Sequence, residues 1–117
     1  MTFSPENLFS ALSDETRLRC LALLVAQGEL CVCELTFALG LSQPKISRHL
    51  AYLRDAELVS DRRAGIWIHY RLARDLPAWA RKVIKTTVTG LADRDPYRAD
   101  SLALKDMPNR PGARGCA

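Results

Sequence analysis

The sequence lacks the features that mark several large classes of protein. No apolar run among its 117 residues approaches the roughly 20 that a membrane-spanning helix needs. The N-terminus has no basic stretch followed by an apolar run, which is the pattern of a secretory signal. There is no Gly-rich phosphate loop and no nucleophile–base motif, and neither of the two histidines has a catalytic setting. We therefore expect a cytoplasmic protein that has no membrane partner, needs no organic cofactor and is not an enzyme.

The composition that is present fits one small globular domain. Hydrophobic residues make up 48% of the chain and charged residues 26%, and domains most often have about 100–150 residues. Lys and Arg number 17 against 13 Asp and Glu, so the net charge is +4. Residues 41–72 hold six basic and three acidic residues, a net of +3, whereas residues 1–40 hold two basic and five acidic, a net of −3. This uneven charge favours one face that contacts a polyanion.

Capping residues and apolar periodicity predict a mainly α fold with a β-hairpin. We expect a short helix from Pro5 through Leu12, a second that opens at 13–15 and stops at Gly28, and further helices over 32–39, 43–57 and 77–91, with strands at 58–63 and 66–72. The helix, tight Gly turn, helix and hairpin in this order predict a winged helix-turn-helix domain over residues 1–93. Half of the six prolines follow residue 95, so we expect residues 94–117 to form a flexible C-terminal tail.

The helix that begins at Ser42 is the expected DNA-reading element. It contains no Asp or Glu from position 42 to 54, whereas a merely solvated helix face usually mixes both signs of charge. Arg and Lys side chains read guanine and Gln reads adenine in the major groove of double-stranded DNA. Arginines near the hairpin tip are placed to reach flanking phosphates or the minor groove. The predicted DNA-binding residues are Ser42, Gln43, Lys45, Ser47, Arg48, Tyr52, Arg62 and Arg63.

Two of the four cysteines, Cys31 and Cys33, lie at the start of the helix that supports the DNA-reading helix. Side chains at i and i+2 are about 200° apart in a helix but share a face in an extended segment. The two thiols can therefore meet only if the backbone is extended there or the first helical turn opens. Such a pair suits a soft metal or metalloid, or a redox switch. The alternative is that both are small apolar residues that fill the start of a helix.

The sequence indicates the roles of the other two cysteines and of His69 less clearly. Cys20 falls within an apolar helix stripe, so we interpret it as a core residue. Cys116 lies near the end of the expected tail, which spans about 25 Å as a flexible chain of 20 residues, so it can reach the cysteine pair of its own or a partner chain. The alternative, which the position near the chain end favours, is a stray exposed thiol. His69 lies between apolar strand neighbours, which favours a structural histidine with satisfied hydrogen bonds.

Four segments in order resemble the ArsR/SmtB family, most closely its arsenical-resistance repressors. They are residues 10–18 (SALSDETRL), 29–35 (ELCVCEL), 42–50 (SQPKISRHL) and 67–72 (WIHYRL). The resemblance implies a homodimeric repressor of its own operon that leaves the operator when it binds trivalent arsenic or antimony. It also implies that the first and last helices form the dimer interface. The apolar positions that fit this interface are Leu8, Phe9, Leu12, Leu76, Ala80, Val83, Ile84 and Leu91.

The resemblance assigns the arsenic site to Cys31 and Cys33 but leaves the third ligand open. In the best-known arsenite-sensing pattern a third cysteine follows three positions after the second, and here that position is Thr36. Cys116 can supply the third thiolate. Alternatively, the inducer is methylarsenite, in which carbon already occupies one arsenic position, or arsenite or antimonite is held by two thiolates and an oxygen.

Other sensing chemistries compete with the metalloid. Zinc-sensing relatives place His and acidic ligands on the last helix, but residues 77–91 contain no His, Asp, Glu or Cys. This argues against that zinc site. A repressor that responds to thiol oxidation without any metalloid is the main alternative. A constitutive DNA-binding or protein-interaction module with structural cysteines is a third.

Overall fold

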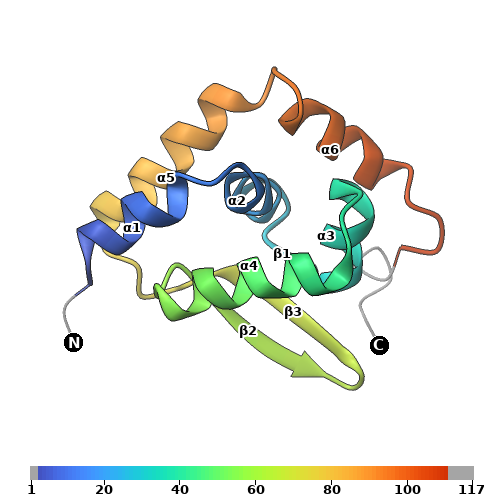
Figure 1. The fold of residues 1–117 in the computed structure, drawn as a ribbon, viewed down its shortest axis with the longest axis horizontal. Coiled ribbons are helices and arrows are strands. Elements are labelled where there is room, and N and C mark those ends of the chain that lie inside the picture. Colours follow the sequence, from blue (N-terminus) through green and yellow to red (C-terminus); the bar gives the residue numbers. More distant parts are fainter. Residues whose placement is uncertain (1–2, 111–117) are drawn as a thin grey trace.

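The computed structural model describes residues 3–110 and folds them into helices around a small sheet. The helices are α1 (Pro5–Leu12), α2 (Glu15–Gln27), α3 (Val32–Leu39), α4 (Gln43–Asp55), α5 (Ala78–Leu91) and α6 (Tyr97–Lys105). The strands are β1 (Glu29–Cys31), β2 (Val59–Ala64) and β3 (Trp67–Leu72). In Figure 1, α2 is seen end-on near the centre, α1 and α5 lie to its left, α3 and α6 to its right, and α4 and the β2–β3 hairpin below. The predicted winged helix-turn-helix fold is confirmed.

The helix boundaries follow from the capping residues that the sequence places there. Side chains of Ser4, Asp14 and Ser42 each accept a hydrogen bond from a backbone N–H in the first turn of α1, α2 and α4. Gly40 ends α3 with φ +67°, a left-handed conformation that glycine adopts at little cost. Among residues 3–110, no helix has the length and apolar character needed to cross a membrane.

The core lies where α2 meets the other helices and one face of the sheet. Leu21 and Leu24 of α2, Leu35 of α3 and Leu50 of α4 are fully or almost fully buried there. Cys20 is also completely buried in this core, as predicted. Because α3 and α4 both pack on this core, the tight turn at Gly40 holds them as one helix-turn-helix unit.

The sheet contains a strand that the periodicity did not predict. Its order is β1-β3-β2, with all neighbours antiparallel. β1 has three residues, too few for a period-two pattern, and its pairing with β3 places Leu30 opposite Tyr70 and Cys31 opposite His69. Since β1 leads directly into α3, the hairpin and the start of α3 are joined by backbone hydrogen bonds.

The C-terminal segment differs from the flexible tail that was expected from residue 94. Residues 97–105 form α6, which packs against α3 and α2. Asp100 of α6 is buried and accepts two hydrogen bonds from the Arg19 guanidinium, at 2.8 and 2.7 Å. The sequence gives little indication of α6, because the charged Asp100 lies on the buried face of the helix. Its partner, Arg19, lies 81 positions away in the sequence. Residues 111–117 lie outside the described part of the chain.

The packing of α6 predicts how substitutions at two of its leucines affect stability. Leu104 is completely buried, whereas Leu102 is 53% exposed. We expect Leu104→Ala to lower the free energy of unfolding by about 2–5 kcal/mol, the usual result of emptying a buried leucine site. Leu102→Ala is the matched control and should change it by less than about 0.5 kcal/mol. Urea denaturation measures both, and equal small effects would mean that α6 is not docked.

Candidate thiol site and nucleic-acid interface

Cys31 and Cys33 meet at the junction of β1 and α3. Cys31 ends the strand and is the N-cap of α3, with extended backbone angles (φ −85°, ψ 163°), and Cys33 lies in the first helical turn. Their Cα atoms are 5.4 Å apart and the two sulfurs are joined in a disulfide. Of the two arrangements that the sequence allowed for a meeting of the thiols, this is the one in which an extended residue at position 31 brings the side chains together. The pair can bind a soft ion when reduced, or cycle between dithiol and disulfide.

A buried carboxylate fixes the backbone at this junction. Glu34 is completely buried, and its Oε1 accepts a hydrogen bond from the Cys31 backbone N–H at 2.9 Å. Its Oε2 accepts from Nε of Arg110, whose Nη2 also donates to Gln27 at 3.2 Å. The end of the described chain is therefore tied to the start of α3. Sequence analysis singled out neither Glu34 nor Arg110, because their pairing spans 76 positions.

Cys116, the third predicted ligand, lies outside the described residues. It follows Arg110 by six positions. Six residues of extended chain span at most about 20 Å. Because Arg110 is bonded to Glu34 in the first turn of α3, this length is sufficient for the Cys116 thiol to reach the cysteine pair. The position of Cys116 itself stays a prediction.

Cys33 also lines a groove of about 750 Å³ between α3, α4 and β3. We call it the Cys33 groove. The hydroxyl of Thr36, which stands at the position of the missing third cysteine, has no hydrogen-bond partner among the described residues. The groove is lined by Val32, Cys33, Thr36 and Phe37 of α3, by Gln43, Ser47, Ala51 and Arg54 of α4, and by Ile66, Trp67, Ile68, Tyr70 and Met107.

His69 lies beside the thiol site but does not have the satisfied hydrogen bonds that the sequence suggested. It is paired with Cys31 across the β1–β3 ladder and is buried. Its Nδ1 lies 3.8 Å from Oε1 of Glu29, and its Nε2 has no hydrogen-bond partner among residues 3–110. Glu29 in turn forms a two-pronged ion pair with Arg62, at 2.6 and 3.1 Å. Hydrogen bonding to Arg62 lowers the pKa of Glu29.

The N-terminal half of α4 presents the predicted DNA-reading side chains. Ser42, Gln43 and Arg48 are exposed, and Lys45 and Ser47 are half-buried. Figure 1 shows the β2–β3 hairpin below α4. An ion pair between Arg54 of α4 and Asp61 of β2, at 3.2 Å, joins the two. Arg63 is exposed near the tip of this hairpin, whereas the Arg62 guanidinium is engaged by Glu29 and would have to share or leave that ion pair to contact DNA.

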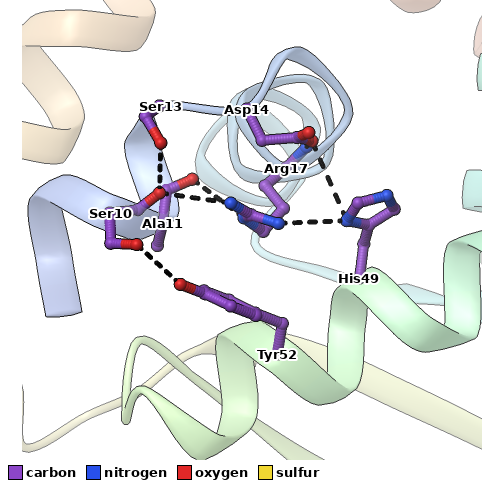
Figure 2. A network of polar contacts seen from close by, with 7 residues as sticks. All are labelled: Ser10, Ala11, Ser13, Asp14, Arg17, His49 and Tyr52. Atoms are coloured by element: carbon purple, nitrogen blue, oxygen red, sulfur yellow. Dashed lines mark hydrogen bonds and ion pairs between the residues drawn. The ribbon is translucent and has the colours of Figure 1, made fainter.

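Tyr52, in the second half of α4, is held by other parts of the chain. Figure 2 shows its hydroxyl sharing a 2.7 Å hydrogen bond with the Ser10 hydroxyl of α1. The Arg17 guanidinium lies 4.0 Å from the centre of its ring. Although 40% exposed, Tyr52 therefore has an internal role beside its predicted contact with DNA. Arg17 was not singled out from the sequence, because nothing local indicates that an arginine near the start of α2 will reach α4.

Arg17 and His49 complete this network between α1, α2 and α4. Arg17 donates to the backbone carbonyls of Ala11 and Ser10, at 3.1 Å each, and its Nη1 lies 3.4 Å from Nδ1 of His49 (Figure 2). Asp14 lies 3.8 Å from the same ring nitrogen. Partial burial lowers the pKa of His49, assisted by the charges of Arg17, Arg48 and Lys45, while Asp14 acts in the opposite direction.

The predicted dimer-interface residues divide into two groups. Leu8, Leu76, Ala80 and Ile84 are buried in the chain's own core and are covered without a partner. Leu12, Val83 and Leu91 are half-buried, and Phe9 of α1 is 55% exposed. On α5, Trp79 is also exposed, and its ring meets that of Phe3 edge-on at 5.9 Å between centroids. Exposed aromatic rings on α1 and α5 are consistent with an interface there.

Comparisons with known proteins agree with this arrangement. Residues 14–61 match the family described as "Bacterial regulatory protein, arsR family". The chain is 48% identical over 108 residues to the arsenic resistance transcriptional regulator ArsR1 of Pseudomonas putida, covering 92% of this chain and 83% of that protein. It is 59% identical over 80 residues to the arsenical resistance operon repressor of Escherichia coli, covering 68% of each.

The fold is also similar to solved structures. One is the solution structure of a homodimeric winged helix-turn-helix DNA-binding domain from Mycobacterium bovis, with a TM-score of 0.60 and 31% identity. The match covers 77% of this chain and 83% of that one. The similarity extends over most of the described fold and so is not limited to the helix-turn-helix.

The environment of His49 makes a prediction about pH. Its pKa lies below the usual 6.5 in the folded chain, so the unfolded chain binds the proton more readily, and stability should fall as the pH drops below about 6.5. NMR titration of the imidazole should give a pKa below 6.5 in the native protein and the ordinary value in urea. The His49→Gln variant assigns the signal. A His49 pKa above 6.5 in the native protein would contradict this prediction, because the attraction of Asp14 for the charged imidazole would then outweigh burial and the nearby positive charges.

Proposed function

The chain belongs to the ArsR family of bacterial regulatory proteins, and on that premise we propose that it is a homodimeric repressor of operator DNA, released when trivalent arsenic or antimony binds to Cys31 and Cys33. The observation that carries the proposal is the meeting of the two thiols at the N-cap of α3. That helix is separated from α4 only by the turn at Gly40.

The DNA-binding part of the proposal rests on the chemistry of α4. Its exposed N-terminal half carries Gln43 and Arg48, which suit base edges in the major groove. The hydroxyl of Ser42 accepts the Lys45 N–H and so holds the first turn of the helix in place. Arg63 on the hairpin is positioned for phosphate contacts. Because phosphate contacts release counterions, the affinity for DNA should fall steeply as salt concentration rises.

The exposed surface of α1 and α5 supports the homodimer. Exposed aromatic side chains such as Phe9 and Trp79 gain from burial against a second copy. In a two-fold dimer the two α4 helices would meet half-sites about one helical turn of DNA apart, or a multiple of it. The operator should then be close to a palindrome.

The ligand part of the proposal rests on the softness of the thiolates. Two sulfur donors favour a thiophilic metalloid over hard or borderline cations. In the described residues no cluster of three or more His, Cys, Asp or Glu side chains is placed to hold a metal ion. Arsenic bound to both sulfurs stands between Cys31 and Cys33, so the first turn of α3 must adjust to it. Since α3 and α4 pack on each other, that adjustment is transmitted to the DNA-reading helix.

The first test is the release of DNA in a fluorescence-anisotropy assay with the promoter region of the gene, under a phosphine reductant. Arsenite should release the wild-type protein, whereas Cys31→Ser/Cys33→Ser should bind DNA normally and stay bound. Arg48→Ala is the converse control, and it should weaken DNA binding about tenfold or more while arsenite binding persists. Release of the double cysteine variant by arsenite would overturn the proposed site.

The third ligand has its own test. We propose that Cys116 supplies the third thiolate for inorganic arsenite, because Arg110 anchors the preceding chain at α3. Cys116→Ser should then raise the arsenite concentration needed for half-release by about tenfold or more, equivalent to about 1.4 kcal/mol of binding free energy. An unchanged arsenite response would assign the site to two thiolates and an oxygen.

A thiol-redox repressor is the second candidate function, and the disulfide between Cys31 and Cys33 favours it. In this case oxidation of the dithiol, by a disulfide or diazo oxidant, releases the DNA without any metalloid. The same assay distinguishes the two functions. Release by diamide, together with no response to arsenite under the phosphine, would favour the redox function. Release by arsenite in the fully reduced protein favours the metalloid function.

A further inference from the structure

A small basic pocket lies at the end of β3, apart from the groove beside α4. Ile68 and Tyr70 of β3 line the Cys33 groove together with residues of α4. Because side chains alternate along a strand, Arg71 leaves the sheet on the opposite face. It lines a pocket of about 180 Å³ between the end of α2, the end of β3 and α5, which we call the Arg71 pocket. Its lining residues are Leu24, Val25, Gly28, Arg71, Leu72, Arg74, Arg81 and Lys85.

The charge of this pocket has one sign. Among the described residues, three arginines and Lys85 line it, and no Asp or Glu does. A surface that is merely solvated usually mixes both signs of charge. Arg81 and Lys85 also border a neighbouring hollow on α5 together with Lys82, so the positive potential extends beyond the pocket. A concave site lined by one sign of charge concentrates ions of the opposite sign.

The pocket also has hydrogen-bond donors to spare. The Nε of Arg71 is buried and has no partner among residues 3–110, although buried polar groups are nearly always hydrogen-bonded. Arg81 donates from Nη2 to the backbone carbonyl of Ala73 at 2.7 Å, which holds the guanidinium in place and leaves its other N–H groups for a ligand. Arg71 and Arg74 line an adjoining pocket as well, and there they meet the buried His69, whose Nε2 is unpartnered among the same residues.

The two carboxylates of the adjoining pocket are engaged by other arginines. Glu29 and Asp61 both line that pocket. Glu29 accepts two hydrogen bonds from Arg62, and Asp61 is paired with Arg54 of α4. Neither carboxylate lines the Arg71 pocket itself. The positive charges there are therefore available to an anion from outside the chain.

The pocket lies on a different face of α5 from the residue expected at the dimer interface. Arg81 follows Trp79 by two positions, which places it about 200° around the helix. Lys85 lies one turn after Arg81, on the same face. In a homodimer formed through Phe9 and Trp79, the Arg71 pocket would stay accessible.

We propose that the Arg71 pocket binds a phosphate group. Arginine recognises this tetrahedral oxyanion with two parallel N–H···O bonds, and lysine adds a point charge. The volume of about 180 Å³ is smaller than the roughly 300–1,000 Å³ of pockets for larger organic ligands, so it suits a single small anion. Since no residue of α4 lines the pocket, we expect free inorganic phosphate to occupy it, independently of the thiols and of the DNA-reading helix.

The first arm of the experiment measures phosphate binding to the full-length, reduced protein by isothermal titration calorimetry, at constant ionic strength kept with chloride. The pocket variant is Arg74→Gln/Lys85→Gln, which neutralises two exposed side chains of the pocket. The matched control is Arg98→Gln/Lys105→Gln, which neutralises two exposed side chains of α6 outside it. We expect the dissociation constant for phosphate to rise about tenfold or more in the pocket variant and to stay unchanged in the control.

A conservative variant separates charge from fold. Arg74→Lys/Lys85→Arg keeps both positive charges and should retain phosphate binding within about threefold of wild type. If it loses binding as completely as the neutralised variant while circular dichroism shows an intact fold, the proposed charge recognition is wrong.

The second arm asks whether the DNA backbone supplies the phosphate group instead. Fluorescence anisotropy measures the affinity for promoter DNA over a range of chloride concentrations. If DNA is the source, the pocket variant should bind more weakly than its control, and its salt dependence should fall by about two phosphate contacts.

The two arms together decide the proposal. Phosphate binding that only the pocket variant loses supports free phosphate. Loss of DNA affinity in that variant alone, with no binding of free phosphate, keeps the site and assigns its phosphate group to DNA. Equal behaviour of the pocket variant and its control in both arms overturns the site, and the arsenite response of Cys31 and Cys33 is unaffected by that result.

Discussion

The thiol site depends on the hydrogen bonds that the buried carboxylate of Glu34 accepts. A charge removed from water costs several kcal/mol unless partners compensate for it. Here one oxygen accepts the Cys31 backbone N–H and the other accepts the Arg110 guanidinium. The first contact fixes the residue that must be extended if the two sulfurs are to meet, and the second brings the C-terminal segment to the same place. Loss of either partner would leave one oxygen of the buried Glu34 carboxylate without a hydrogen bond. The two contacts together therefore hold the end of β1, the start of α3 and Arg110 in place.

The other end of α3 is fixed in a similar way. Arg19 of α2 donates to the carbonyl of Leu39 and to both oxygens of Asp100 on α6. The helix that carries the cysteines is thus bonded at its start through Arg110 and at its end through Arg19, and both anchors involve the segment after residue 94. A ligand at the first turn therefore acts on a helix whose ends are restrained. The elements packed on α3 are α6, α4 and the sheet, and of these α4 carries the predicted DNA-binding side chains.

The parts of the structure that the sequence predicted are those set by local chemistry. Ser4, Asp14, Ser42 and Gly40 mark helix ends within one turn of themselves, and backbone periodicity gives the condition under which Cys31 and Cys33 can meet, namely an extended backbone or an opened first turn. The parts it missed depend on distant partners. Three-residue β1 exists because β3 is beside it, and α6 is docked by an ion pair with Arg19. The pairing of Arg62 with Glu29 likewise follows only from the sheet register.

These constraints divide α4 into two halves with different roles. The C-terminal half is anchored, because Tyr52 is bonded to Ser10 and covered by Arg17, and Arg54 is paired with Asp61 of the hairpin. The N-terminal half carries the side chains suited to DNA and borders the Cys33 groove. A helix anchored at one end changes its orientation most at the other. Under the proposed function, a small adjustment beside Cys33 would therefore have its largest effect on Gln43 and its neighbours, and the affinity for DNA would change without disruption of the rest of the fold.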